Sequence, residues 1–136
     1  MRVVVDTNIW LSGLLWSGVP GQILELVENS EIDAIGSEEI LDELLKTLSR
    51  PKFEKRLNQL RLDIDAVMLG VRQVMTIVPT IVIQVPNLRD PKDSMIISAA
   101  ISGRAKLIVT GDQDLLVLKE IAGIKILLPK DLLARH

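Results

Sequence analysis

The sequence predicts an α/β protein, a three-layer α/β/α sandwich around a central, mainly parallel, Rossmann-like sheet. Three observations support this fold class. Short apolar runs without polar alternation recur along the chain, which is typical of strands buried on both faces of a parallel sheet. Segments with helical apolar spacing separate these runs, so strand and helix alternate. No repeat, low-complexity tract or linker interrupts the pattern, and we therefore expect residues 1–136 to form one domain.

The elements follow in order along the chain. Strands are expected at residues 2–6, at 32–36, within 75–85, at 106–110 and at 125–128. Helices are expected at roughly residues 19–29, 38–49, 52–60, 64–74, 92–102 and 113–122, with a short final turn after Pro129. Ser37 is a favourable N-cap for the second helix, and Gly103 and Gly123 are expected to end helices as C-cap glycines do.

Composition excludes several classes of protein. Apolar residues make up 48% of the chain and charged residues 25%, the balance of a folded globular domain. There is no cysteine, no targeting segment and no run of membrane-spanning length, so we expect a cytoplasmic protein without disulfides or membrane contact. The single histidine, His136, leaves no Ser-His or Cys-His pair and no histidine-ligated zinc site. Neither the Walker pattern nor the glycine-rich dinucleotide-binding pattern follows the first strand.

Aspartates stand at or just beyond the carboxyl ends of two expected strands. Asp6 follows the first strand, and Asp112 follows the fourth in the sequence Thr110-Gly111-Asp112, with Asp114 two residues further on. Ligands of open parallel sheets bind beyond the carboxyl ends of the strands, so Asp6 and Asp112 converge if these strands are neighbours. Alternatively, Asp112 only caps the next helix and Asp6 only begins a turn.

A third acidic segment opens the helix expected at residues 92–102. Asp90 fits the N-cap, because Pro91 suits the first helical position. Capping does not explain Asp93, which shares the face expected to pack on the sheet with Ile96, Ile97 and Ala100. An unpaired charge on a buried face is costly, so Asp93 is expected to be paired or to bind a metal.

The helix at residues 38–49 begins with four acidic residues, Glu38, Glu39, Asp42 and Glu43. The helix dipole favours acidic side chains there, so most of them need no functional explanation. The stripe expected to be buried is Ile40, Leu41, Leu44, Leu45 and Leu48. Asp42 and Glu43 flank this stripe on either side, and the residues alone do not decide between them.

The net charge of −2 argues against non-specific binding along duplex nucleic acid. Basic residues are nevertheless concentrated in one stretch of the chain. Only Glu54 opposes this group, which is Lys46, Arg50, Lys52, Lys55, Arg56 and Arg61. The stretch is either a solvated helix face or a track for the phosphates of a substrate.

Two tryptophans, Trp10 and Trp16, lie in an apolar stretch that connects the first strand to the first expected helix. We expect them to pack in the core. The alternative is a surface for self-association or for a protein partner, because large aromatic side chains anchor interfaces.

Taken together, the acidic motifs resemble the PIN domain of nucleases. The resemblance rests on Asp6-Thr7-Asn8 after the first strand, Glu43 in an early helix, Asp93 opening a helix and Thr110-Gly111-Asp112 after a late strand. It covers the whole chain and is greatest with the bacterial and archaeal toxins of VapBC-type toxin–antitoxin systems. It implies an acidic quartet of Asp6, Glu43, Asp93 and Asp112, with Asp114 as accessory, Asn8 and Thr110 as orienting groups, and Asp90 either in the site or only a cap.

The resemblance also implies a cofactor and partners. Carboxylates about 4 Å apart repel by roughly 4 kcal/mol at an effective dielectric near 20, so the quartet requires a cation. Oxygen ligands without nitrogen or sulfur suit Mg²⁺ or Mn²⁺, and hydrolysis of RNA by activated water would leave 5′-phosphate and 3′-hydroxyl ends. An antitoxin protein and a homodimer or higher oligomer are the other implied partners.

Two alternatives to a ribonuclease remain. One is a non-catalytic PIN-like module that binds RNA or a protein and keeps the acidic residues for metal-linked folding. The other is a structure-specific DNA nuclease, although the short chain lacks the added DNA-binding segments that such enzymes usually need.

Overall fold

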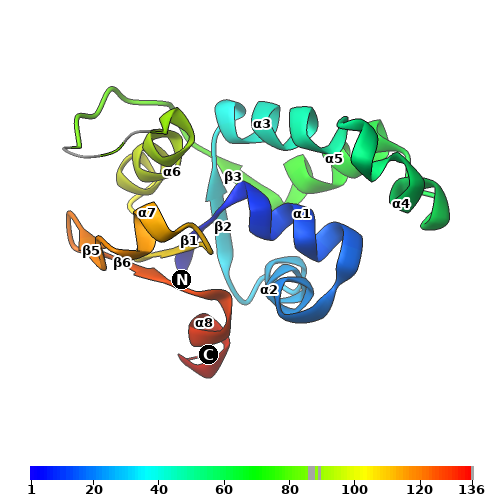
Figure 1. Cartoon of the computed structure of the whole chain (residues 1–136). Helices are drawn as coiled ribbons and strands as arrows, with labels where there is room; N and C mark the ends of the chain where they lie inside the picture. The colour runs from blue at the N-terminus through cyan, green and yellow to red at the C-terminus, as the bar shows by residue number, and fades with distance from the viewer. Residues whose placement is uncertain (86–87, 89, 136) are drawn as a thin grey trace.

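The computed structural model describes residues 1–85, 88 and 90–135, so His136 lies outside the described residues. Within this part of the chain, six strands form one sheet in the order β3-β2-β1-β4-β6-β5 (Figure 1). The strands are β1 (Arg2–Val5), β2 (Asp33–Gly36), β3 (Met75–Ile77), β4 (Leu107–Val109), β5 (Glu120–Ile121) and β6 (Ile124–Leu127). All neighbours are parallel except the antiparallel pair β5 and β6, which confirms the expected mainly parallel sheet.

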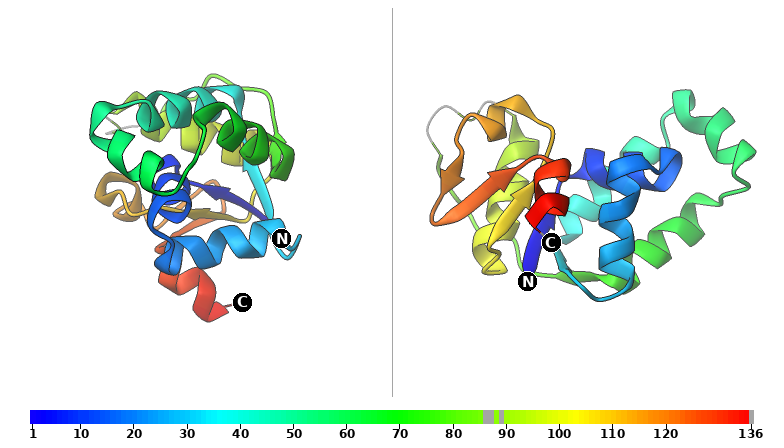
Figure 2. Two further views of the ribbon diagram at one scale, coloured as in Figure 1. Left: turned by 90° about the vertical axis from the view of Figure 1, so that its right-hand side faces the viewer. Right: turned by 90° about the horizontal axis from the view of Figure 1, so that it is seen from below.

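Helices cover the two faces of this sheet (Figures 1 and 2). On one side lie α3, α5 and α6, and on the other lie α2 and α8. The helical segments are α1 (Thr7–Trp16), α2 (Gly18–Glu28), α3 (Glu38–Leu48), the 3₁₀ turn η1 (Pro51–Phe53), α4 (Glu54–Gln59), α5 (Ile64–Val74), α6 (Pro91–Ser102), α7 (Gln113–Leu116) and α8 (Pro129–Arg135). None of the helices in the described residues is both long enough and apolar enough to cross a membrane.

The centre of the sheet is its most buried part. Val3, Val4 and Val5 of β1 are fully buried between β2 and β4, and each contributes about 1.5–3 kcal/mol of hydrophobic free energy. The hydrogen bonds between strands continue past the strand ends, because Asp6 N–H donates to the Val109 carbonyl at 2.9 Å. The first residues after β1 and β4 are therefore held side by side.

The segment between β1 and α2 is a helix that we did not expect. Helix α1 starts directly after Asp6, whose side chain accepts from the Asn8 N–H and caps it. Its buried residues, Ile9, Trp10, Leu11 and Leu15, do not form a single stripe against a polar face. A helix that is apolar on most sides lacks the periodicity from which a helix is predicted.

The expected helix at residues 113–122 was wrong beyond its first turn. Helix α7 ends at Leu116, and a β-hairpin of β5 and β6 follows. Its two turn residues, Ala122 and Gly123, have φ values of 51° and 79°, the left-handed pair that a tight two-residue hairpin needs. Gly123 therefore serves this turn and caps no helix. Gly103 does end α6, as expected.

Candidate metal centre

The ends of β1 and β4 form a hydrogen-bonded group of three residues. The Thr110 hydroxyl donates to Asp6 Oδ2 at 2.5 Å and accepts from the Asp112 N–H at 2.9 Å. Thr110 is fully buried and Asp6 is 9% exposed. The expected convergence of Asp6 and Asp112 is confirmed, and Thr110 fixes the side chain of one and the backbone of the other.

Ionisation of the Asp6 carboxyl is unfavourable because the group is buried. Burial raises the pKa of the Asp6 carboxyl above its ordinary value, opposed by the hydrogen bonds from Thr110 and from the Asn8 backbone, while the Asp112 charge raises it further. The Asn8 N–H lies 3.4 Å from Asp6 Oδ1, and the Asn8 side chain is exposed. The contact of Asn8 with Asp6 in the structure is thus made by its backbone.

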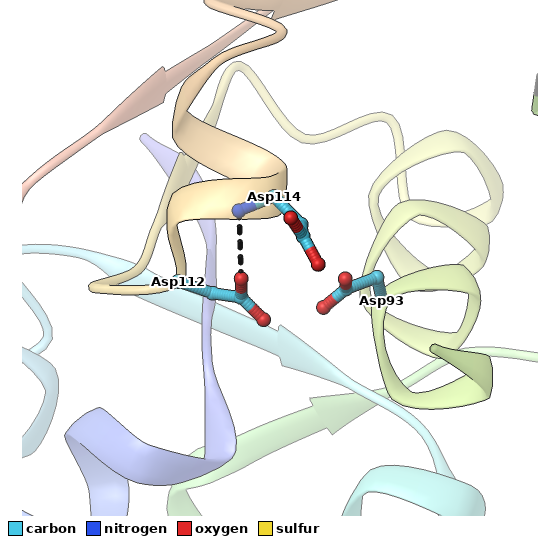
Figure 3. A group of neighbouring side chains, drawn as sticks. All are labelled: Asp93, Asp112 and Asp114. Carbon is cyan, nitrogen blue, oxygen red and sulfur yellow. Dashed lines mark hydrogen bonds between the residues drawn. The ribbon is translucent and has the colours of Figure 1, made fainter. Parts of the chain in front are cut away.

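Three carboxylates from two helices lie close together beside this group. Oxygens of Asp93, Asp112 and Asp114 lie within 4.8 Å of one another, and the side chains point toward a common space (Figure 3). The Asp114 N–H donates to Asp112 Oδ1 at 2.8 Å, so Asp112 also caps α7. Asp112 therefore caps α7 and also belongs to this group of neighbouring carboxylates.

Asp93 is the most unusual member of the cluster. Its side chain is on the sheet-facing side of α6 and only 2% exposed, and its Oδ2 is buried without a hydrogen-bond partner among the described residues. Burial, then the adjacent Asp112 carboxyl, and then the charges of Asp90 and Asp6 raise the pKa of Asp93 to about 7. The cluster is therefore not fully ionised at neutral pH unless a cation compensates its charge.

Asp90 occupies the N-cap of α6, where its Oδ1 accepts from the Lys92 N–H at 3.0 Å. Its capping role is confirmed. Its charge also acts on Asp93, as noted above, so it lies within electrostatic range of the cluster.

Glu43 lies beside the first turn of α6. Its carboxylate is paired with the Lys92 ammonium at 3.0 Å and is only 14% exposed on its side chain. Asp42 is exposed, and its charge acts on Arg72 of α5. The two residues that the helix pattern left undecided therefore differ in burial and in partner. Glu43 is not among the three converging carboxylates, and within the described residues it is linked to them only through Lys92, the residue before Asp93.

Lys92 was not predicted as a residue of the site. Its position one residue before Asp93 is the feature of the sequence that could have indicated it. Helical geometry alone does not reveal that its side chain reaches across to α3.

The basic stretch lies away from this cluster, on the end of α3, on η1 and on α4. The two tryptophans separate: Trp10 is 2% exposed, and Trp16 is 52% exposed. The expectation of core packing is confirmed for Trp10 and was wrong for Trp16. Leu45, expected in the buried stripe of α3, is also exposed.

Comparison with known proteins gives the family. Residues 2–114 match the family model of the PIN domain. The chain belongs to the PIN domain family. PIN domains are generally nucleases, hydrolases of phosphodiester bonds, and they typically use divalent metal ions. An uncharacterised protein of Methanocaldococcus jannaschii is 35% identical over 126 residues, covering 88% of this chain and 76% of that protein.

A solved structure supports the same architecture. This PIN domain superimposes on a chain of the crystal structure of VapBC2 from Rickettsia felis bound to a DNA fragment from its promoter, with a TM-score of 0.59. The match covers 93% of this chain and 97% of that chain, at 18% sequence identity. At this identity the likeness shows a shared fold.

The donor atoms of this PIN domain fit a hard divalent cation. The cluster offers carboxylate oxygens only, and the described residues place no histidine or cysteine in it. A buried carboxylate oxygen without a partner, Asp93 Oδ2, is the kind of atom that a cation satisfies. Mg²⁺ and Mn²⁺ are the common cations with this ligand preference.

Proposed function

We propose that this PIN domain, acting as one unit over residues 1–136, is a Mg²⁺- or Mn²⁺-dependent ribonuclease. The observation that supports this most strongly is the convergence of Asp93, Asp112 and Asp114 around a buried, unpartnered carboxylate oxygen. Without a cation, such a buried carboxylate is charged only at a free-energy cost or is held protonated, as the raised pKa of Asp93 indicates, whereas a bound cation lets it stay ionised.

In this proposal the acidic side chains hold the cation, and other residues orient them. Asp93, Asp112 and Asp114 are ligands, and Asp6 and Glu43 complete the acidic site. Thr110 holds Asp6 by its hydroxyl hydrogen bond, and Lys92 neutralises Glu43 while no cation is bound. When bound, the cation activates water and offsets the charge of the scissile phosphate.

We further propose that the protein is the toxin of a toxin–antitoxin pair and that it forms a homodimer or higher oligomer. The support is the fold shared over nearly the whole chain with a component of the VapBC2 complex. An antitoxin protein would then be its partner, in addition to its RNA substrate.

The test is cleavage of a labelled single-stranded RNA with Mn²⁺ or Mg²⁺ and with chelator. We expect cleavage only with metal, and a loss of more than about 100-fold in rate in Asp93→Asn and in Asp112→Asn. Asp63→Asn is the matched control, because Asp63 also caps a helix, α5, by accepting from the Ala66 N–H, and asparagine keeps that cap. Full activity of Asp93→Asn, or cleavage in chelator, would contradict the proposal. Equal cleavage of single-stranded DNA would contradict its restriction to RNA.

A further inference from the structure

Trp16 is an exposed aromatic residue at the end of α1. About half of its surface is open to solvent, although Trp10, six positions earlier on the same helix, is buried. Burial of an indole ring stabilises a structure more than burial of most side chains, so the exposure of Trp16 suggests that a binding partner covers it.

The ring of Trp16 is held in place from two sides. The Phe53 ring meets it edge to face, with centroids 5.8 Å apart and an interplanar angle of 64°. The Arg56 guanidinium lies 5.9 Å from the ring centroid, and its Nε–H donates to the Leu15 carbonyl at 2.7 Å. The two terminal amino groups of Arg56 take no part in that hydrogen bond. The ring is thus oriented before any ligand arrives, which reduces the entropy lost on stacking.

Positive charge surrounds this ring. Residues 50–56 carry four basic side chains against one acidic one, a local charge of +3 in a chain of net charge −2. The Lys52 ammonium lies 5.1 Å from the centroid of Phe53, the residue that supports Trp16. A protein partner would need matching acidic groups, whereas a nucleic acid strand offers phosphates for the cations and bases for the ring.

The position of the ring suits a strand that leads to the acidic cluster. Helix α1 begins next to Asp6 and is ten residues, or about 15 Å, long. In the right-hand view of Figure 2, α1, α4 and α7 all lie toward the side of the molecule opposite the N-terminus. A strand could therefore pass from Trp16 to the cluster within a few nucleotides.

We propose that Trp16, with Arg56 and Lys52, forms a stacking platform for an unpaired base of the RNA substrate. The surface is called the Trp16 platform below. Aromatic rings beside basic side chains are how proteins bind single strands without reading their sequence, because every base has a π-face and every nucleotide has a phosphate. The proposal rests on the nuclease function for its choice of RNA, and its experiment measures binding separately from cleavage.

The experiment measures binding of a short labelled single-stranded RNA in chelator, where the substrate is not cut, by fluorescence anisotropy. Trp16→Ala is expected to weaken binding by about 5- to 150-fold, which corresponds to the free energy of stacking one base on an aromatic ring. Trp16→Phe, which keeps an aromatic face, should recover most of the loss. Leu69→Ala is the control, because Leu69 is an apolar residue on another helix that is also more than half exposed, at 62%.

Two further readouts separate stacking from a structural effect. Tryptophan fluorescence of the parent should be quenched by RNA and that of Trp16→Phe should not, because the remaining Trp10 is buried. Trp16→Ala should leave the slope of log affinity against log salt unchanged, whereas Lys52→Gln should reduce it by about 0.7. The RNA duplex should bind the parent and Trp16→Ala equally.

The results that overturn the Trp16 platform differ from those that overturn the nuclease. Equal single-strand binding by Trp16→Ala and the parent, or no binding by the parent, contradicts the platform even if the parent cleaves RNA. A change of oligomeric state in Trp16→Ala without a change in RNA affinity assigns the surface to a protein contact and also contradicts it. Trp16-dependent binding without any metal-dependent cleavage would support the platform and contradict the nuclease.

Discussion

Asp93 begins a helix whose other buried positions are apolar or small, and it is nearly inaccessible to solvent. A neutral residue there would satisfy the packing. The carboxyl group instead makes the stability of the folded protein depend on the charges around it, and this dependence can be measured without any substrate.

The first prediction concerns pH. In the folded protein the pKa of Asp93 is raised from 3.8 to about 7, so between these values the folded protein holds a proton that the unfolded chain has released. The stability from this proton is fully present below about pH 4 and is lost as the pH rises to about 7. In chelator, the free energy of unfolding of the parent should fall relative to Asp93→Asn by up to about 1.4 kcal/mol per pH unit in this range.

The measurement is urea unfolding of both proteins across that pH range, with Asp63→Asn as the control that should follow the parent. A difference between parent and Asp93→Asn that does not change with pH would show that Asp93 is ionised throughout. The cluster would then be less crowded than the structure indicates.

The sequence correctly predicted that Asp93 is buried, because it shares an apolar stripe with Ile96, Ile97 and Ala100. It predicted Trp16 and Leu45 poorly. Helical spacing places a residue on a face, but whether that face is covered depends on which elements pack against it, and Trp16 lies where α1 ends beside η1.

Helix α7 is only one turn long, and its N-cap residue, Asp112, also belongs to the acidic cluster. The two roles respond differently to substitution. Asparagine keeps the cap and removes the charge, whereas alanine removes both.

The second prediction uses this difference. In chelator, Asp112→Asn should melt at a higher temperature than the parent, because one of the repelling carboxylates is neutralised. Asp112→Ala should fall below Asp112→Asn by about 0.5–2 kcal/mol, the value of an N-cap. With Mn²⁺ at a hundredfold excess over the dissociation constant, the parent should gain about 2.7 kcal/mol and Asp112→Asn much less. The melting temperatures, with and without metal, give all three comparisons. Equal shifts of parent and Asp112→Asn by metal would mean that Asp112 is not a ligand.

Elements with regular periodicity were predicted closely, and those without it were not. Helix α5 was expected at its observed bounds, and in the structure Asp63 caps it by accepting from the Ala66 N–H. Helix α1 is apolar on most sides, and the hairpin of β5 and β6 turns on Ala122-Gly123, where alanine in a left-handed conformation gives little warning. In both cases packing against the rest of the fold decides the local structure.

For the whole molecule, the order of strands could be predicted only in part. The buried apolar runs indicated a parallel sheet, but whether β1 and β4 are neighbours was left open; they are, and Asp6 and Asp112 therefore converge. The link between Lys92 and Glu43 could not be predicted, because it depends on how α6 lies against α3. Spacing within one element is local information, whereas contacts between elements depend on the assembled fold.

Carboxylates from segments far apart in the sequence are proposed to form one cation site. Equilibrium binding of Mn²⁺, followed by loss of the electron paramagnetic resonance signal of the free ion, tests it most directly. We predict saturable binding by the parent and by Asp63→Asn, and an affinity reduced by more than about 10-fold in Asp93→Asn and in Asp112→Asn. If Asp93→Asn binds Mn²⁺ as tightly as the parent, the acidic residues do not share a cation and the account is contradicted.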